Sequence, residues 1–176
     1  MFATIFVPNF YLQGALRHQA IPPTMPVALI EENDKKPLIL QLNRAAEAAG
    51  VAKGMTPSQG LARCLSLLIK TRSFSQEKSI QEIVLHYAFS LSPFVEASSP
   101  GVCTVQFTKA QELLSKVSQV IDQLAACEVN AQAGLSQTPD TSFLAAHLGR
   151  PVLEIKDPKK FLAPLSIDTL AIPLPS

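Results

Sequence analysis

The sequence lacks an excess of charge of either sign. Fifteen lysines and arginines stand against 14 aspartates and glutamates, which leaves a formal net charge of +1 at pH 7. A chain this close to neutral has no overall field that would attract nucleic acid, a membrane surface or an acidic substrate. Its partners therefore cannot be inferred from net charge.

We also expect no N-terminal targeting segment. The stretch MFATIFVPNF contains no lysine or arginine, and its apolar run is too short for a signal peptide or a membrane helix. The three cysteines, Cys64, Cys103 and Cys127, form no CxxC pair and have no histidine at metal-ligand spacing. We expect buried thiols in a reducing compartment, and hence a cytoplasmic protein with no membrane partner.

Short β-rich segments alternate with helical ones along a chain of 176 residues, 47% of them hydrophobic. The runs PVALIEE and PLILQL flank the polar turn NDKK, and VEA precedes VCTVQF, so two hairpins are predicted. Further strands are predicted at FATIFV, SLLIKT, NAQAGLS and PVLEI. The length suits one domain, or one domain with a small lobe.

The helical segments carry recognisable start signals. Thr56 and Thr138 are each followed by a proline, as expected of an N-cap and a first helical residue, and Thr108 is predicted to cap a third helix. The run SFSQEKSIQEIVLHYAFSLSP has apolar residues at helical spacing. The element order predicts an α+β fold: an antiparallel, ferredoxin-like (split βαβ) sheet with helices on one face and a small helical subdomain inserted at residues 43–67.

Four longer phrases occur in one order: IFVPNFYLQGAL, LQLNRAAEAAGVAKGMTPSQGLARC, FSLSPFVEASSPGVCTVQFT and AQAGLSQTPDTSFLAAHLGRP. In order and spacing they resemble the UmuC/DinB-type (Y-family) translesion DNA polymerases, and in particular the non-catalytic ImuB-like branch. The resemblance implies a palm-like domain over residues 1–42 and 68–176 and a fingers-like helical subdomain over 43–67. The thumb and little-finger domains are absent from this chain, and the proline-rich ending LAPLSIDTLAIPLPS is where we expect a longer protein to continue.

The resemblance also implies a two-metal site, and here the chain departs from the family. Family members hold two Mg²⁺ ions with an acid at the end of the first strand and an Asp-Glu pair on the second hairpin, because the ions need hard oxygen ligands. Laid on this sequence without a gap, those positions fall on Pro8, Gly101 and Val102. No acid precedes Glu31 and none lies between Glu96 and Glu112. We therefore expect no catalytic residue, no metal ligand and no cofactor.

The nucleotide-binding positions that the resemblance implies are only partly kept. The family's triphosphate-contacting Tyr and Arg fall on Arg44 and Glu47, and its basic residue near the triphosphate falls on Arg150. Arg44 and Arg150 are the candidate nucleotide-binding residues, while Glu47 would repel phosphates. Simpler alternatives stay open: Arg44 and Glu47 as a solvated ion pair, and Arg150 as a basic residue at a helix end.

Other polar residues have both a functional and a structural interpretation. Glu96 is either a substitute metal ligand or a solvent-facing strand residue, and the histidines at 86 and 147 are expected at the rim or in the core rather than on a metal. The segment Ser98–Gly101 reads as a turn. Four basic residues lie within a short stretch and form either a phosphate-contacting rim or a solvated face: Lys53, Arg63, Lys70 and Arg72.

Three functions are compatible with these observations. The first is a non-catalytic, polymerase-like scaffold for DNA-damage tolerance, with a replicative-type polymerase, a RecA-like accessory protein and the sliding clamp as the partners that the resemblance implies, and DNA contacts mainly through C-terminal domains. The second is an active nucleotidyltransferase whose metals are held by Glu31, Glu32 or Glu96. The third is an unrelated α+β binding module.

Overall fold

The computed structural model describes residues 1–31, 36–108 and 112–166. The chain divides into two compact units: Met1–Pro8 together with Gln81–Ser176, and Asn9–Ile80. We call them the first and the second unit and describe each by itself.

The first unit is built on a five-stranded sheet in the order β5-β6-β1-β7-β8. The strands are β1 (Phe2–Phe6), β5 (Val95–Ser99), β6 (Val102–Gln106), β7 (Gln132–Ser136) and β8 (Val152–Glu154). The central strand β1 is antiparallel to both β6 and β7, whereas β7 and β8 are parallel. The predicted hairpin of VEA with VCTVQF is confirmed as β5 and β6.

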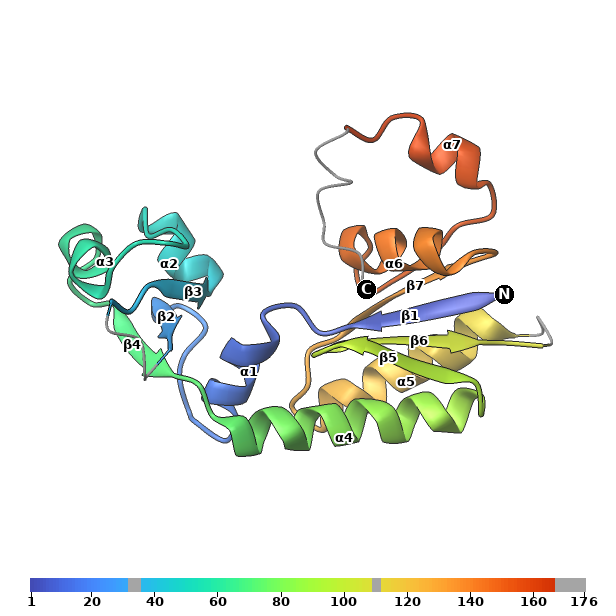
Figure 1. Ribbon diagram of the computed structural model, residues 1–176, viewed down its shortest axis with the longest axis horizontal. Helices are drawn as coiled ribbons and strands as arrows, with labels where there is room; N and C mark the ends of the chain where they lie inside the picture. Colours follow the sequence, from blue (N-terminus) through green and yellow to red (C-terminus); the bar gives the residue numbers. More distant parts are fainter. Residues whose placement is uncertain (32–35, 109–111, 167–176) are drawn as a thin grey trace. The chain divides into compact units, whose positions relative to one another are not determined.

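Helices cover both faces of this sheet, whereas the sequence predicted helices on one face only. Figure 1 shows α6 (Pro139–Leu148) on one side and the sheet's other side facing α4 (Phe74–Leu91) and α5 (Leu113–Ala126). Both faces of the central strands are accordingly buried: every residue of β7 is buried, as are Ala3 and Thr4 on β1. The α+β class, with a palm-like sheet and a fingers-like helical part, is otherwise as predicted. A short helix, α7 (Pro158–Leu162), follows β8.

A chain of buried hydroxyl groups joins the sheet to α6. Thr4 Oγ1 lies 3.1 Å from Thr104 Oγ1 and 2.8 Å from Ser142 Oγ, and the Ser142 hydroxyl donates to the carbonyl of Pro139 at 2.7 Å. Helix α6 begins as predicted, with Thr138 accepting a hydrogen bond from the Thr141 N–H. These bonds satisfy polar groups that would otherwise be costly to bury in the core.

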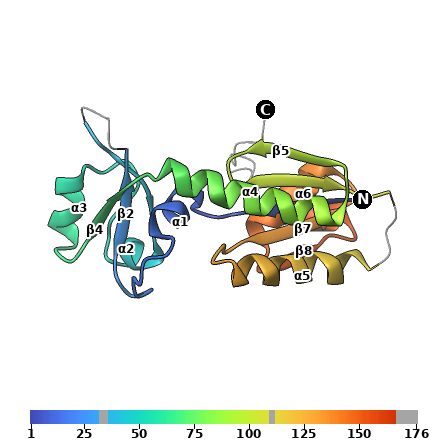
Figure 2. The ribbon, with the colours of Figure 1, turned by 90° about the horizontal axis from the view of Figure 1, so that it is seen from below.

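The second unit contains a separate three-stranded sheet in the order β3-β2-β4. Strands β2 (Val27–Ile30) and β3 (Ile39–Leu42) form the predicted hairpin, and β4 (Leu68–Thr71) lies parallel to β2, as Figure 2 shows. The unit also contains the short helices α1 (Phe10–Leu16), α2 (Arg44–Ala48) and α3 (Pro57–Arg63), and the start of α4 up to Ile80. The N-terminus of α3 is a capping box in which Thr56 and Gln59 satisfy each other's backbone N–H groups.

The bounds of these packing units differ from those predicted for the palm-like and fingers-like domains. Residues 43–67 do not pack alone: Ala46, Val51 and Leu67 share a core with Ala28 and Ile39 of the second sheet. Because β2, β3 and β4 bury their apolar side chains against the small helices, residues 9–80 form one unit.

The burial of the cysteines agrees in part with the expectation of buried thiols. All three cysteines are free; Cys64 and Cys103 are buried, and Cys127 is only partly buried, with its sulfur 3.6 Å from the Tyr87 hydroxyl. Within the described residues, no helix is both long enough and apolar enough to span a bilayer.

Candidate nucleotide and metal site

The structure brings together the positions on which the family's metal-binding acids would fall. Phe6, at the end of β1, lies directly opposite Val102, at the start of β6. One residue further, the Val7 N–H donates to the carbonyl of Gly101 at 2.8 Å. Pro8, which follows β1, and Gly101, which precedes β6, therefore lie at the same end of this strand pair.

The side chains at these positions do not fit a divalent cation. Pro8 has no ligating atom, and Gly101 has no side chain and is held in the left-handed region at φ 75°. Val102 is an apolar side chain with 5% of its surface exposed. Mg²⁺ takes oxygen ligands, of which these three side chains supply none. Across the described ranges, with their gaps at 32–35, 109–111 and 167–176, no three His, Cys, Asp or Glu side chains gather as a metal site.

Two neighbours of this position were not found from the sequence. The amide oxygen of Gln81, on α4, accepts a hydrogen bond of 3.0 Å from the Gly101 N–H. The imidazole of His147, on α6, stacks on the Phe6 ring with centroids 3.8 Å apart. Neither had a sequence signal, because both contacts join residues far apart in the chain.

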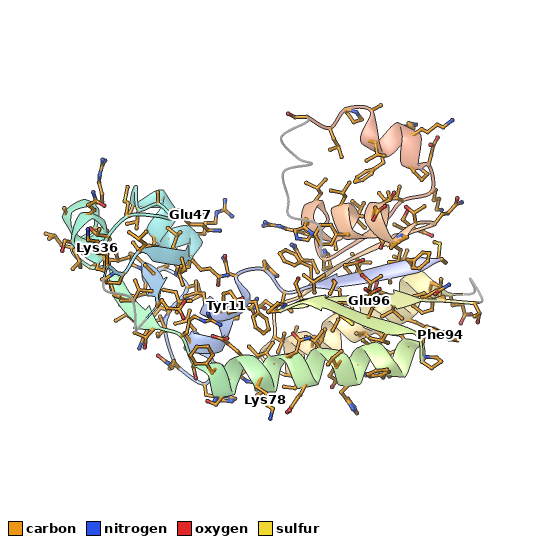
Figure 3. The ribbon with its side chains drawn as sticks, viewed as in Figure 1. Tyr11, Lys36, Glu47, Lys78, Phe94 and Glu96 are labelled. Atoms are coloured by element: carbon orange, nitrogen blue, oxygen red, sulfur yellow. The ribbon has the colours of Figure 1, made fainter. Side chains whose placement is uncertain are left out.

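Glu96, the candidate substitute ligand, lies at a different level of the sheet from the Gly101 turn. It pairs with Thr104 on β6, two residues along the strand from Val102, which places it about 7 Å further from the Gly101 turn. Its exposed side chain lines a shallow hollow of about 280 Å³ together with Phe94 and Pro139. Figure 3 shows Glu96 and Phe94 on this part of the first unit. The solvent-facing interpretation of Glu96 agrees with its exposure.

His147 is packed against aromatic rings. Besides Phe6, it contacts the Phe143 ring at 4.2 Å, and its Nδ1 lies 2.9 Å from the Phe143 carbonyl oxygen, to which it donates as the Nδ1–H tautomer. Burial lowers the pKa of His147, and the hydrogen bond to Phe143 acts in the opposite direction. A partly buried imidazole with this surrounding is a packing residue, while His86 is exposed on α4.

The candidate nucleotide-binding residues lie in different units. Arg44 is the first residue of α2 in the second unit, where Asn43 caps the helix, and both Arg44 and Glu47 are exposed. Figure 3 labels Glu47 on that helix. The predicted Arg44–Glu47 ion pair does not form among the described residues. Arg150, in the first unit, is exposed and follows Gly149, the C-cap of α6.

Arg72 is held by ion pairs and ring contacts, which its place in a basic cluster of the sequence did not indicate. Its guanidinium binds both carboxylate oxygens of Glu77, at 2.9 and 2.7 Å, and contacts Glu31 at 3.4 Å. It also lies over the rings of Tyr11, at 4.0 Å from the centroid, and Phe74, at 4.7 Å. The hydrogen bond to Glu77, before any other cause, raises the pKa of Arg72, so the side chain stays charged. Glu31 is thereby an ion-pair partner, and Glu32, the other alternative acid of this region, lies outside the described residues.

The fold is that of a Y-family DNA polymerase. The chain is similar to a post-insertion binary complex of Dbh DNA polymerase, with a TM-score of 0.80 and 16% identity over 96% of this chain and 52% of that one. It is similar to DinB from Sulfolobus solfataricus, with a TM-score of 0.78 and 14% identity over 96% and 53%. A Y-family DNA polymerase chimera of Dbh and Dpo4 gives a TM-score of 0.77 at 12% identity, again over 96% and 53%.

The family model of the impB/mucB/samB family matches residues 5–147, and the chain belongs to this family. No match was found among curated proteins. The chain spans about half the length of the solved structures that it resembles.

Proposed function

We propose that this chain is the palm and fingers part of a DNA-damage-tolerance protein that keeps the polymerase fold without polymerase chemistry. One observation carries the proposal: β1 and β6 meet as the family's metal site requires, yet Pro8, Gly101 and Val102 offer no oxygen ligand there. The buried Val102 lies opposite Phe6 in the sheet, so the position contributes to packing. On this account the sheet was retained for its stability and shape.

The alternative of a rebuilt nucleotidyltransferase site has less support. Glu31 is paired with Arg72, and Glu96 pairs with Thr104, at a different level of the sheet from the Gly101 turn. The alternative of an unrelated binding module is at odds with the family match over residues 5–147.

The proposal extends to partners. An ImuB-like scaffold would act in the cytoplasm with a replicative-type polymerase, a RecA-like accessory protein and the sliding clamp, and would contact DNA mainly through domains beyond the palm and fingers. Arg44 and Arg150 are proposed as remnants of the nucleotide-binding surface, because both are exposed and basic.

Titration calorimetry of Mn²⁺ with a deoxynucleoside triphosphate tests the loss of metal chemistry. The triphosphate is also titrated without the metal, and we expect Mn²⁺ to add no binding of its own in the natural chain or in a Glu96→Gln control. A variant with Pro8→Asp, Gly101→Asp and Val102→Glu restores the acids, with its folding checked by circular dichroism. Mn²⁺-dependent binding by the natural chain at micromolar concentrations would sink the proposal, and its loss in Glu96→Gln would identify Glu96 as the ligand.

A further inference from the structure

The second unit contains a polar cavity of about 430 Å³ that no residue of the expected nucleotide site lines. Its walls come from the end of α1 and the residues after it, from the end of β4, and from the start of α4. This volume is within the range of small-ligand pockets, about 300–1,000 Å³. Its position therefore defines a candidate site separate from Arg44 and Arg150.

The charged residues that line the cavity are all basic. Arg17, Lys70 and Arg72 line it, and none of its lining residues is acidic. The two carboxylates nearby, those of Glu31 and Glu77, are bound by Arg72. Arg72 is thus balanced by these two carboxylates, and neither of them pairs with Lys70, which adds its own positive charge to the cavity wall.

Lys70 carries most of this argument. It is a partly buried residue of β4, and it forms no ion pair within the described part of the chain. Because Lys70 lines the cavity and its charge is not paired there with a carboxylate, an anion bound in the cavity would gain a direct electrostatic partner. Because Lys70 pairs with Leu29 in the sheet, its backbone is held in place beside the cavity.

Neighbouring groups add directed hydrogen-bond donors. Arg17 donates to the Ser79 hydroxyl at 3.4 Å, which orients its guanidinium, and Arg72 is fixed by Glu77. The Ser73 hydroxyl and the Gln76 amide also line the cavity. A rigid set of cations with additional neutral donors matches an anion that has several oxygen acceptors.

We propose that this cavity binds a phosphate group, either a phosphodiester of single-stranded DNA or a free phosphate compound. Phosphate offers more charge and more acceptor oxygens than a carboxylate, and so it makes fuller use of Lys70 beside Arg17 and Arg72. The proposal does not depend on the polymerase-like function, since the site uses none of the residues that the family resemblance implies.

The test is a ¹H–¹⁵N NMR titration of the chain with pyrophosphate and, separately, with a short oligothymidylate. We expect the amide signals of Thr71, Ser73 and Gln76 to shift with at least one of the two. Lys70→Gln should weaken that binding about tenfold, and Lys116→Gln, a change at an exposed lysine of α5 that does not line the cavity, should leave it unchanged. Thermal melts of both variants check that each is folded.

The two probes identify the source of the phosphate. Tighter binding of oligothymidylate, with a log–log salt slope that falls by about one in Lys70→Gln, indicates a nucleic-acid backbone. Tighter binding of pyrophosphate indicates a free phosphate compound. Either result supports the proposal. Unchanged cavity amides with both probes, or shifts that Lys70→Gln does not weaken, would overturn it.

Discussion

Arg72 binds Glu77 through two hydrogen bonds, from Nε to Oε1 at 2.9 Å and from Nη2 to Oε2 at 2.7 Å. The two side chains expose 19% and 9% of their surface, so the pair is well shielded from water. A pair of this kind fixes geometry, and loss of one partner leaves the other charge partly buried.

The first prediction concerns this pair. Glu77→Gln should lower the free energy of unfolding by about 2–4 kcal/mol, because it leaves the Arg72 charge short of its main partner. Arg72→Lys should also be destabilising, since a lysine cannot form the two-pronged contact. A double-mutant cycle in urea with Arg72→Met and Glu77→Gln should give a coupling energy of about 1–3 kcal/mol. Additive effects would mean that the contact contributes little.

A second prediction concerns the close approach of β7 and α6. A Cβ on Gly134 would overlap the carbonyl oxygen of Ser142 and the amide nitrogen of Ala146, both backbone atoms of α6. Gly134→Ala should therefore cost about 2–4 kcal/mol or prevent folding. Gly50→Ala is the matched control: its added methyl meets open space, and only the left-handed backbone, at φ 84°, opposes it, at about 1 kcal/mol. Urea midpoints measure both, and equal losses would contradict the packing described here.

The third prediction is a pH dependence of stability. Because burial lowers the pKa of His147, the unfolded chain takes up a proton more readily than the folded one. The stability that the neutral ring contributes is present above the unfolded pKa, about 6.5, and is lost as the pH falls through the lower folded value. His147→Phe keeps an aromatic ring against Phe6 and should flatten the fall in Tm between about pH 7 and pH 5.

The control for this measurement is His86→Gln, a change on the exposed side of α4. It should leave the pH profile of the natural chain unaltered. A profile that stays equally steep in His147→Phe would assign the acid sensitivity to other groups.

A fourth prediction concerns the thiols. Burial raises the pKa of Cys103 to about 12, so this thiol is almost entirely protonated at mildly alkaline pH. Cys127 is only partly buried. Iodoacetamide at mildly alkaline pH should modify Cys127 first and Cys103 only when denaturant unfolds the chain, as read by peptide mass spectrometry. Early labelling of Cys103 would show that β6 opens readily.

The local elements were largely predictable from the sequence, because their signals are local. Thr56 with Gln59 and Thr138 with Pro139 mark helix starts that the structure keeps. One start was wrong: α5 begins at Leu113 after Glu112, and Thr108 is not its cap. The signal there was only a threonine before a polar stretch, which is weak evidence on its own.

Long-range features could not be read from the sequence. Periodicity located the strand of Lys70 but not its parallel pairing with β2, which gives residues 9–80 a sheet of their own. The sequence also did not show that Arg72 pairs with Glu77 and Glu31. A cluster of basic residues has the same sequence pattern whether its side chains are solvated or bound to carboxylates. The strands beside Pro8 and Gly101 were predictable, because FATIFV and VCTVQF are β-rich runs next to turn residues.

The most direct test of the central claim measures where Mn²⁺ approaches the folded chain. Paramagnetic broadening of backbone amides by Mn²⁺, in the presence of a deoxynucleoside triphosphate, reports proximity of the ion to Val7, Gly101 and Val102. We predict that these amides stay sharp in the natural chain and broaden in the variant with Pro8→Asp, Gly101→Asp and Val102→Glu. Selective broadening of the three amides in the natural chain at micromolar Mn²⁺ would contradict the account and indicate a working metal site.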